Sequence, residues 1–152
     1  MSDVTLARES PRRAGVGRLQ AALDTYQSVL YPAESNHFLD VDALSAPAVR
    51  FFVARRDGTA LGCAALRIDP ENYGELKRMY VTPEARGMSL GRRLLERVEA
   101  EARREGLECL RLETGIHQPE ALGLYRSAGY REREPFGDYA RDPLSVFMEK
   151  RL

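Results

Sequence analysis

The sequence predicts an α/β fold, a single domain in which helices flank a central mixed, mostly antiparallel β-sheet. Three observations lead to this prediction. The chain has 152 residues, which is the size of one ordinary domain. Its hydrophobic pattern changes between the spacing of a helix and that of a strand. The expected elements then follow in the order strand, helices, three strands, helix, strand, helix and two strands, without a linker or a repeat.

The chain begins with a short strand that leads into a helix. Residues 4–9 alternate as a strand does, and apolar residues recur at helical spacing from residue 15 to 30. We expect this helix to end at Tyr31, because the following Pro32 lacks an amide donor and disfavours a helical residue before it. After a polar loop, residues 40–44 are expected to add one helical turn.

Three consecutive strands are expected next, joined as an antiparallel meander. Residues 49–55 are rich in strand-forming residues, and the pair Asp57-Gly58 is a strong signal for a hairpin turn. The returning strand covers residues 60–68. A second turn leads into a strand over residues 73–81.

The second half of the chain contains the clearest helix. Apolar residues repeat every four positions over residues 90–105, and Gly106 suits the position just past the helix end. The remaining expected elements are a strand over residues 108–114, a helix over residues 119–128, and two terminal strands over residues 130–134 and 144–150.

The composition argues against several classes of protein. The 23 Lys and Arg residues balance the 23 Asp and Glu residues, so the basic excess of a nucleic-acid binder is absent. We expect a cytoplasmic protein that binds no membrane, because no segment has the apolar run of a signal peptide or of a membrane span. Cys63 and Cys109 are expected to be buried thiols. With only two histidines in the chain, no metal site is expected.

The most informative segment is the junction between the strand over residues 73–81 and the long helix. It reads Arg86-Gly87-Met88-Ser89-Leu90-Gly91 and continues with Arg92 and Arg93. Unpaired backbone amides and the positive end of a helix dipole favour a phosphate at such a place. The glycines allow close approach of a ligand, and the arginines add positive charge. The spacing matches neither the Walker loop nor the GxGxxG dinucleotide fingerprint.

A second segment, residues 118–130, completes the pattern. It contains Gln118, an alanine, the pair Leu124-Tyr125, and then a glycine followed by Tyr130. Together the two segments resemble the GNAT superfamily of N-acetyltransferases over residues 51–130; the first 45 residues agree in element order. The resemblance implies a GNAT-type domain over residues 1–152. It also implies an enzyme that transfers the acetyl group of acetyl-CoA to a primary amine by direct attack.

The resemblance identifies the loop as the pyrophosphate loop of this family, with Ser89 where a glycine is usual. The serine keeps its backbone amide and adds a hydroxyl, but serine normally requires a negative φ, so an ordinary φ is expected there. In this family CoA lies where the strand before the loop separates from its neighbour. Backbone groups of Met79 and Val81 would bind the pantetheine arm, and an amide near Val81 would polarise the thioester carbonyl. The expected cofactor-binding residues are Met79, Tyr80, Val81, Arg86, Gly87, Met88, Ser89, Leu90, Gly91, Arg92 and Gln118.

Two residues are expected to take part in catalysis. By resemblance, Tyr125 would donate a proton to the departing CoA thiolate as a general acid. The amine must be neutral to attack, although the pKa of an alkyl ammonium is about 10, so a base is expected. Glu75 occupies a position where some members of the family carry a catalytic glutamate. The alternative is that Glu75 forms a salt bridge with Lys77 or Arg67.

The acceptor is expected to be a small amine or an amino-acid-like molecule. The candidate substrate-binding residues are Glu34, Asn36, His37, Arg78, Tyr80 and His117. Arg78 could bind a carboxylate in a bidentate manner, or it could equally be an ordinary exposed charge of its strand. The sequence leaves a monomer and a homodimer open. Two further interpretations also stay open: a catalytically idle acyl-CoA-binding sensor, and a regulatory domain whose loop binds a different nucleotide. Turnover with an amine would exclude the first, and competition between ATP and CoA would test the second.

Overall fold

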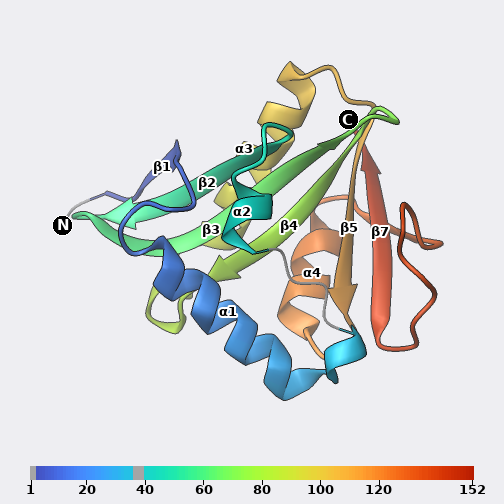
Figure 1. The fold of residues 1–152 in the computed structure, drawn as a ribbon, viewed down its shortest axis with the longest axis horizontal. Coiled ribbons are helices and arrows are strands. Elements are labelled where there is room, and N and C mark those ends of the chain that lie inside the picture. The colour runs from blue at the N-terminus through green and yellow to red at the C-terminus, as the bar shows by residue number, and fades with distance from the viewer. Residues whose placement is uncertain (1–2, 36–39) are drawn as a thin grey trace.

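A seven-stranded sheet in the order β1-β2-β3-β4-β5-β7-β6 forms the centre of the molecule (Figure 1). The computed structural model describes residues 3–35 and 40–152. Its elements in chain order are β1 (Thr5–Arg8), α1 (Val16–Leu30), the short 3₁₀ helix η1 (Ala33–Ser35), α2 (Val41–Leu44), β2 (Val49–Arg56), β3 (Thr59–Asp69), β4 (Tyr73–Val81), the 3₁₀ helix η2 (Pro83–Ala85), α3 (Leu90–Arg104), β5 (Cys109–Gly115), α4 (Pro119–Ser127), β6 (Arg131–Arg133) and β7 (Ser145–Arg151).

The strand pairing is antiparallel throughout the sheet except between β4 and β5, which are parallel. Parallel neighbours need a long crossover connection, and here α3 provides it. Because β4 leads directly into the loop before α3, the start of α3 lies near the end of the strand that borders β5.

Helices cover both faces of the sheet, and alternation along β2 shows which residues face which helix. Phe51 and Val53 pack in one cluster with Val16 and other residues of α1 and α2. Phe52, the residue between them, packs in a second cluster with residues of α3 and α4, among them Leu94. Figure 1 shows α1 and α2 on the near face of the sheet and α3 behind it. The strand period of two residues therefore separates two hydrophobic layers.

An aromatic cluster covers the β5–β7 side of the sheet, and the loop between β6 and β7 supplies half of it. Phe136 and Tyr139 of this loop pack with Tyr73 of β4 and Phe147 of β7. The ring of Phe136 lies 5.2 Å from that of Tyr139 and 5.9 Å from that of Phe147, in edge-on arrangements. This packing fixes the position of Tyr139 beside β4.

The helices and strands predicted from the sequence are confirmed, and their ends differ from the prediction by no more than one residue. The turn expected over residues 40–44 is α2, which Asp40 caps by accepting a hydrogen bond of 2.8 Å from the Ala43 amide. The two 3₁₀ turns were not predicted. Both cysteines are buried thiols, as expected. Within the described ranges, no helix is both long enough and apolar enough to span a bilayer.

Candidate functional site

The parallel strands β4 and β5 separate partway along their length. They pair from Tyr73 and Cys109 to Leu76 and Leu112. Beyond these residues β4 continues to Val81 and β5 to Gly115 without pairing to each other. We call this opening the β4–β5 split. A cavity of about 70 Å³ lies there. Backbone groups on the two facing edges are available for an extended ligand, because neither edge has the other strand to bind.

A β-bulge changes the direction of β4 at the split. The pairing with β3 shifts between Cys63 and Ala65, so that Arg78 and Met79 of β4 together lie opposite one residue of β3. Arg78 has a φ of 56°, which is a left-handed conformation for a residue with a side chain. Such a conformation costs on the order of 1–3 kcal/mol and is retained only where the surroundings enforce it. The bulge is therefore a constrained feature of the site.

The contacts of the Arg78 side chain help to hold its backbone in this conformation. This side chain is 4% exposed, and its guanidinium binds α1 by donating to Gln20 Oε1 at 2.6 Å and to Asp24 Oδ1 at 2.5 Å. The sequence left open whether Arg78 binds a carboxylate of the substrate or is an ordinary exposed charge of the strand. In the described contacts it binds the carboxylate of Asp24 and so attaches α1 to the bulge.

Beyond the bulge, the Val81 amide faces the split. The Thr82 amide donates to the carbonyl of Leu61 in β3 at 2.9 Å. Successive amides of an extended strand point to opposite edges, so the preceding amide points away from β3. This orientation is the one that the predicted contact between Val81 and a thioester carbonyl requires.

The loop before α3 presents a row of backbone amides. Gly87 has a φ of 86° and Ser89 a φ of 57°. The expectation of an ordinary φ at Ser89 was therefore wrong: the serine adopts the left-handed conformation that a glycine would take, at the N-cap of α3. The amides of residues 87–89 donate no backbone hydrogen bond within the part of the chain that the structure describes. They continue into the unpaired first-turn amides of α3, as an anion site requires.

The N-terminus of α3 lies against α4. Arg92 of α3 donates to the Ser127 hydroxyl at 2.5 Å, and a Cβ on Gly91 would lie 3.2 Å from Leu124. Arg86 and Arg92 are exposed, whereas Leu90 is buried in the core. The predicted loop residues, the end of β4 and α4 therefore border one region.

Tyr125 projects from α4 into the same cavity. Its side chain is 5% exposed, and its ring lies 5.9 Å from that of Tyr130 in an edge-on arrangement. Burial raises the pKa of the Tyr125 hydroxyl, and the negative charge of Glu113 raises it further. The phenol therefore stays protonated at neutral pH, as a proton donor must.

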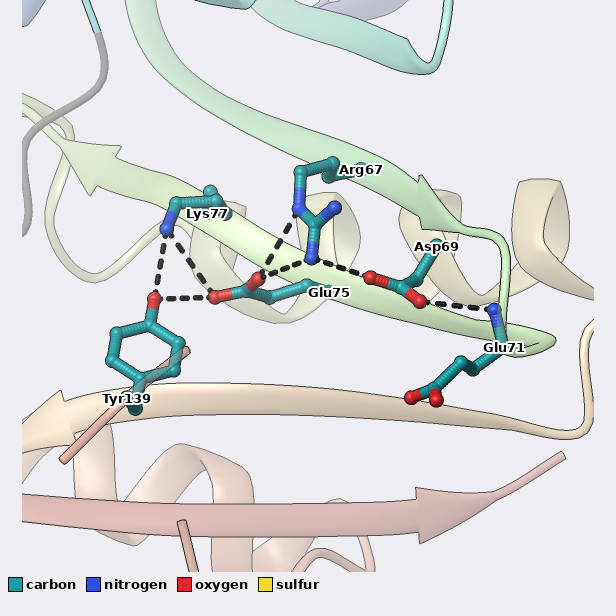
Figure 2. Close-up of polar contacts among 6 residues, drawn as sticks. All are labelled: Arg67, Asp69, Glu71, Glu75, Lys77 and Tyr139. Atoms are coloured by element: carbon teal, nitrogen blue, oxygen red, sulfur yellow. Dashed lines mark hydrogen bonds and ion pairs between the residues drawn. The ribbon is translucent and has the colours of Figure 1, made fainter. Parts of the chain in front are cut away.

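Glu75 lies at the centre of an ionic network on the face opposite α4 (Figure 2). Its Oε1 accepts from Arg67 at 3.2 and 3.4 Å, and its Oε2 accepts from Lys77 at 3.3 Å and from the Tyr139 hydroxyl at 2.5 Å. Arg67 also binds Asp69 at 3.0 Å, and Lys77 donates to the Tyr139 hydroxyl at 2.8 Å. Burial and the charge of Glu75 raise the pKa of Tyr139.

These contacts favour the salt-bridge role of Glu75 over the role of a base. A carboxylate has about four lone-pair positions, and four hydrogen bonds already reach the Glu75 side chain, which is 3% exposed. A proton from an amine would have to displace one of these donors. The network instead joins β3, β4 and the loop between β6 and β7.

The end of α1 closes one side of the cavity through Tyr31. Its hydroxyl accepts from the His117 amide at 3.1 Å and donates to Gln118 Oε1 at 3.2 Å, while its ring stacks on the His117 imidazole at 5.5 Å. A Cβ on Gly115 would lie only 1.8 Å from the Tyr31 hydroxyl. Gln118 lines the cavity, and the exposed His117 lies beside it.

The other expected acceptor residues lie in different places. Glu34 is exposed on η1, whereas its neighbour Ser35 lines the cavity and donates to Asp142 at 2.7 Å. Tyr80 packs against the α1 cluster. Asn36 and His37 lie outside the described residues. Several cavity residues had no expected role in the site, among them Tyr31, Glu113 and Tyr139, and Lys77 was expected only as an alternative ion-pair partner of Glu75.

Over residues 3–35 and 40–152, no cluster of three or more His, Cys, Asp or Glu side chains is arranged to hold a metal ion. The polar side chains that line the cavity carry carboxylates, hydroxyls, two amides, an amine and a guanidinium, and they come from α1, η1, β4, β5, α4 and the segments between elements.

Comparison with known proteins finds relatives that share the sequence pattern and the fold. The sequence model of the acetyltransferase (GNAT) family matches residues 12–130. The chain is 57% identical to the IAA acetyltransferase of Azospirillum brasilense, with all of both chains covered. A crystal structure assigned as an acyl-CoA N-acyltransferase from Klebsiella pneumoniae is 41% identical, with a TM-score of 0.83 over 98% of this chain and 97% of the other. The PaiA N-acetyltransferase of Thermoplasma acidophilum, solved with coenzyme A, shares the fold at 18% identity, with a TM-score of 0.74 over 99% of each chain.

The left-handed Ser89 leads to a testable prediction. Ser89→Gly keeps the amide in a conformation that glycine adopts freely, so CoA affinity should stay within about threefold of wild type. Ser89→Asp places a negative charge beside the phosphates and should weaken CoA by at least about tenfold, or about 1.4 kcal/mol. Calorimetric titration with CoA measures both, and melting temperatures check that the variants fold. Equal affinity in all three proteins would place the pyrophosphate elsewhere.

A second prediction concerns the stability of the Glu75 network. Glu75→Gln leaves Lys77 and Arg67 without their shared carboxylate and should lower the free energy of unfolding by about 2–3 kcal/mol. For a chain of this size the melting temperature should fall by about 5–10 °C. The control is Glu71→Gln in the adjacent turn, whose exposed side chain should change stability by less than about 0.5 kcal/mol.

A double-mutant cycle with Lys77→Met shows whether the stabilisation comes from this ion pair. The double variant should lose less than the sum of the two single losses, by at least about 1 kcal/mol, since the partners touch. Additive losses would mean that Glu75 and Lys77 act independently.

Proposed function

The chain belongs to the acetyltransferase (GNAT) family, and we propose that it transfers the acetyl group of acetyl-CoA to the primary amine of a small molecule by direct attack. It is an N-acetyltransferase of a family that uses acetyl-CoA. The observation on which the proposal depends is the β4–β5 split, with Tyr125 on one side and carboxylates on the other. In this arrangement the thioester binds on the Tyr125 side of the split, and the amine binds on the side of the carboxylates.

The residues around the split fit the parts of CoA. The edges of β4 and β5 beyond Leu76 and Leu112 offer backbone groups to the amides of the pantetheine arm. The amides of residues 87–92 offer donors to the pyrophosphate, and the exposed Arg86 and Arg92 add positive charge. Acetyl-CoA supplies the activated acetyl group. The chain supplies its orientation in the split.

Two groups of the chain stabilise or neutralise the negative charge that develops on the thioester as the reaction proceeds. The Val81 amide stabilises the negative charge that develops on the thioester oxygen, a contribution worth about 3 kcal/mol in other enzymes. The Tyr125 hydroxyl donates its proton to the sulfur as the carbon–sulfur bond breaks. Its burial keeps the phenol protonated for this step.

The acceptor is proposed to be small. The cavity has a volume of about 70 Å³ and is lined by Tyr31 at the end of α1, Tyr125 of α4 and Tyr139 of the β6–β7 loop. The 57% identical relative named IAA acetyltransferase supports a small-molecule acceptor. The catalytically idle sensor is the second candidate, and acetyl transfer to any amine would exclude it.

The first prediction of this proposal concerns the cofactor. Acetyl-CoA at about 100 times its Kd should stabilise the protein by about 2.7 kcal/mol, which raises the melting temperature by about 5–10 °C. ATP and NAD at the same concentration should leave it unchanged within about 1 °C, because the loop matches neither nucleotide fingerprint. Thermal-shift titrations measure all three. No shift with millimolar acetyl-CoA would remove the basis of the proposal.

The second prediction concerns Tyr125. Tyr125→Phe keeps the ring and its packing but loses the proton donor, so kcat should fall by about 10²-fold. The Kd for acetyl-CoA should stay within about twofold, since only the chemical step is affected. Steady-state kinetics and calorimetry give the two numbers, and the melting temperature is the folding control. A kcat within threefold of wild type, with chemistry limiting, would make Tyr125 a packing residue.

A further inference from the structure

Lys77 is the first residue of β4 beyond its last pair with β5. The pairing ends at Leu76 and Leu112, so Lys77 begins the stretch of β4 that borders the β4–β5 split. Its side chain lines the cavity, as do Met79 of the same strand and Tyr125 of α4. The proposed function puts the pantetheine arm along this strand edge and the thioester sulfur beside Tyr125. The Lys77 amine and the activated acetyl group would therefore border one small cavity.

The contacts of the Lys77 amine place it on the side of the split where the acceptor is proposed to bind. Its Nζ donates to Glu75 Oε2 at 3.3 Å and to the Tyr139 hydroxyl at 2.8 Å (Figure 2). An ammonium has three N–H donors, and these two bonds use two of them. The side chain is 12% exposed, and its four-carbon stem is flexible. The amine can therefore turn from these partners into the cavity without a movement of the backbone.

Lysine amines are rare in this chain. Of its 23 Lys and Arg residues only Lys77 and Lys150 are lysines. A guanidinium stays protonated, whereas a lysine amine that loses its proton is a nucleophile. Lys150 lies away from the cavity, where it donates to Glu99 Oε2 at 3.1 Å and lies over the Tyr130 ring. Its side chain is 24% exposed, twice the exposure of Lys77. A reagent in solution therefore reaches Lys150 more easily, whereas a donor bound in the split lies beside Lys77.

We propose that Lys77 is a self-acetylation site, whose amine takes the acetyl group when acetyl-CoA is bound in the split and no acceptor occupies the cavity. The inference rests on the proposed function, which supplies the bound acetyl-CoA. A bond forms between Nζ and the thioester carbonyl carbon, and the carbon–sulfur bond breaks. Two protons leave the ammonium nitrogen: one goes to solvent before the attack, and the other balances the proton that Tyr125 gives to the sulfur. The products are acetylated Lys77 and free CoA.

Acetylation of Lys77 would change the acceptor side of the cavity. The acetylated side chain carries no charge and keeps one N–H, so it cannot bind both Glu75 and Tyr139 as the ammonium does. The added acetyl group also takes up space in a cavity of about 70 Å³. The modified protein should therefore acetylate a small amine more slowly, and an amine that occupies the cavity should protect Lys77. Self-acetylation would thus make activity depend on the ratio of acetyl-CoA to acceptor.

Mass spectrometry tests the site on the full chain. Wild type incubated with acetyl-CoA alone should gain one acetyl group, which peptide mapping should place on Lys77. Lys150 should be modified at least about tenfold more slowly, because only Lys77 is held beside the bound donor. Lys77→Arg keeps a positive charge beside Glu75 and should lose this modification. The matched variant Lys150→Arg should be acetylated on Lys77 as fast as wild type, and melting temperatures check that both variants fold.

The dependence on concentration separates a reaction inside the site from chemical acetylation by acetyl-CoA in solution. Transfer from a bound donor has a rate that saturates near the Kd for acetyl-CoA and does not change with protein concentration. Chemical acetylation increases linearly with acetyl-CoA and favours the more exposed Lys150. A linear dependence, or modification of Lys150 as fast as that of Lys77, would overturn the inference.

The proposed function is tested separately on the same protein, by the thermal shift with acetyl-CoA and by CoA release with a panel of primary amines that includes benzylamine. If acetyl-CoA causes no shift and no amine is acetylated, the proposed function fails, and this inference fails with it. If an amine is acetylated and Lys77 stays unmodified in the absence of amine, the inference alone fails. Saturable acetylation of Lys77 without turnover of any amine would support the inference and contradict the transfer to a small molecule.

Discussion

The hydrogen bonding between β4 and β5 stops after Leu76 and Leu112, and the rest of the site depends on that interruption. Two strands that kept pairing would use their facing amides and carbonyls on each other. Because they diverge, the β4 edge keeps those groups for a ligand, and residues from both faces of the sheet reach one cavity. The bulge at Arg78 lies on the β4 side of this opening, and Tyr139 of the aromatic loop after β6 lines the same cavity.

The ion pairs near the split hold their elements in position and add little to the net stability of the fold. The chain carries no net charge, yet Arg67, Asp69, Glu75 and Lys77 form one network and Arg78 pairs with Asp24. A buried ion pair roughly repays the cost of removing its charges from water, but breaking it is expensive. Such a pair therefore holds its elements in one arrangement. Here the elements are α1, β3, β4 and the loop that carries Tyr139.

The sequence predicted the elements closely because their signals are local. The four-residue repeat of α3, the Asp57-Gly58 turn and the proline after Tyr31 each act over a few residues. Candidate site residues could be named from the sequence where they lie in one local segment, as in the loop of residues 86–92, and their binding role stays a prediction. The partners of Glu75 could not be predicted in the same way. Tyr139 lies 64 residues from Glu75 and occurs in a loop without periodicity, so only the packing of Phe136 and Phe147 brings it to β4.

Ser89 shows why the expectation of an ordinary φ failed at one position of the loop. A serine by itself prefers a negative φ, but the residues on both sides fix the chain direction between η2 and α3. The tertiary requirement therefore overrides the preference of the single residue. The same holds for Arg78, whose left-handed backbone is secured by the contacts of its side chain with α1.

The contact between Gly115 and Tyr31 has a consequence for how sequences of this kind can diverge. The ring occupies the space that any side chain at position 115 would need, with the hydroxyl 1.8 Å from an ideal Cβ. Neither position can change freely while the other stays as it is. An alanine at 115 requires a smaller residue at 31, and that smaller residue would give up the hydrogen bonds to His117 and Gln118. Positions 31 and 115 should therefore covary, and where both differ the cavity should have another shape and accept another molecule.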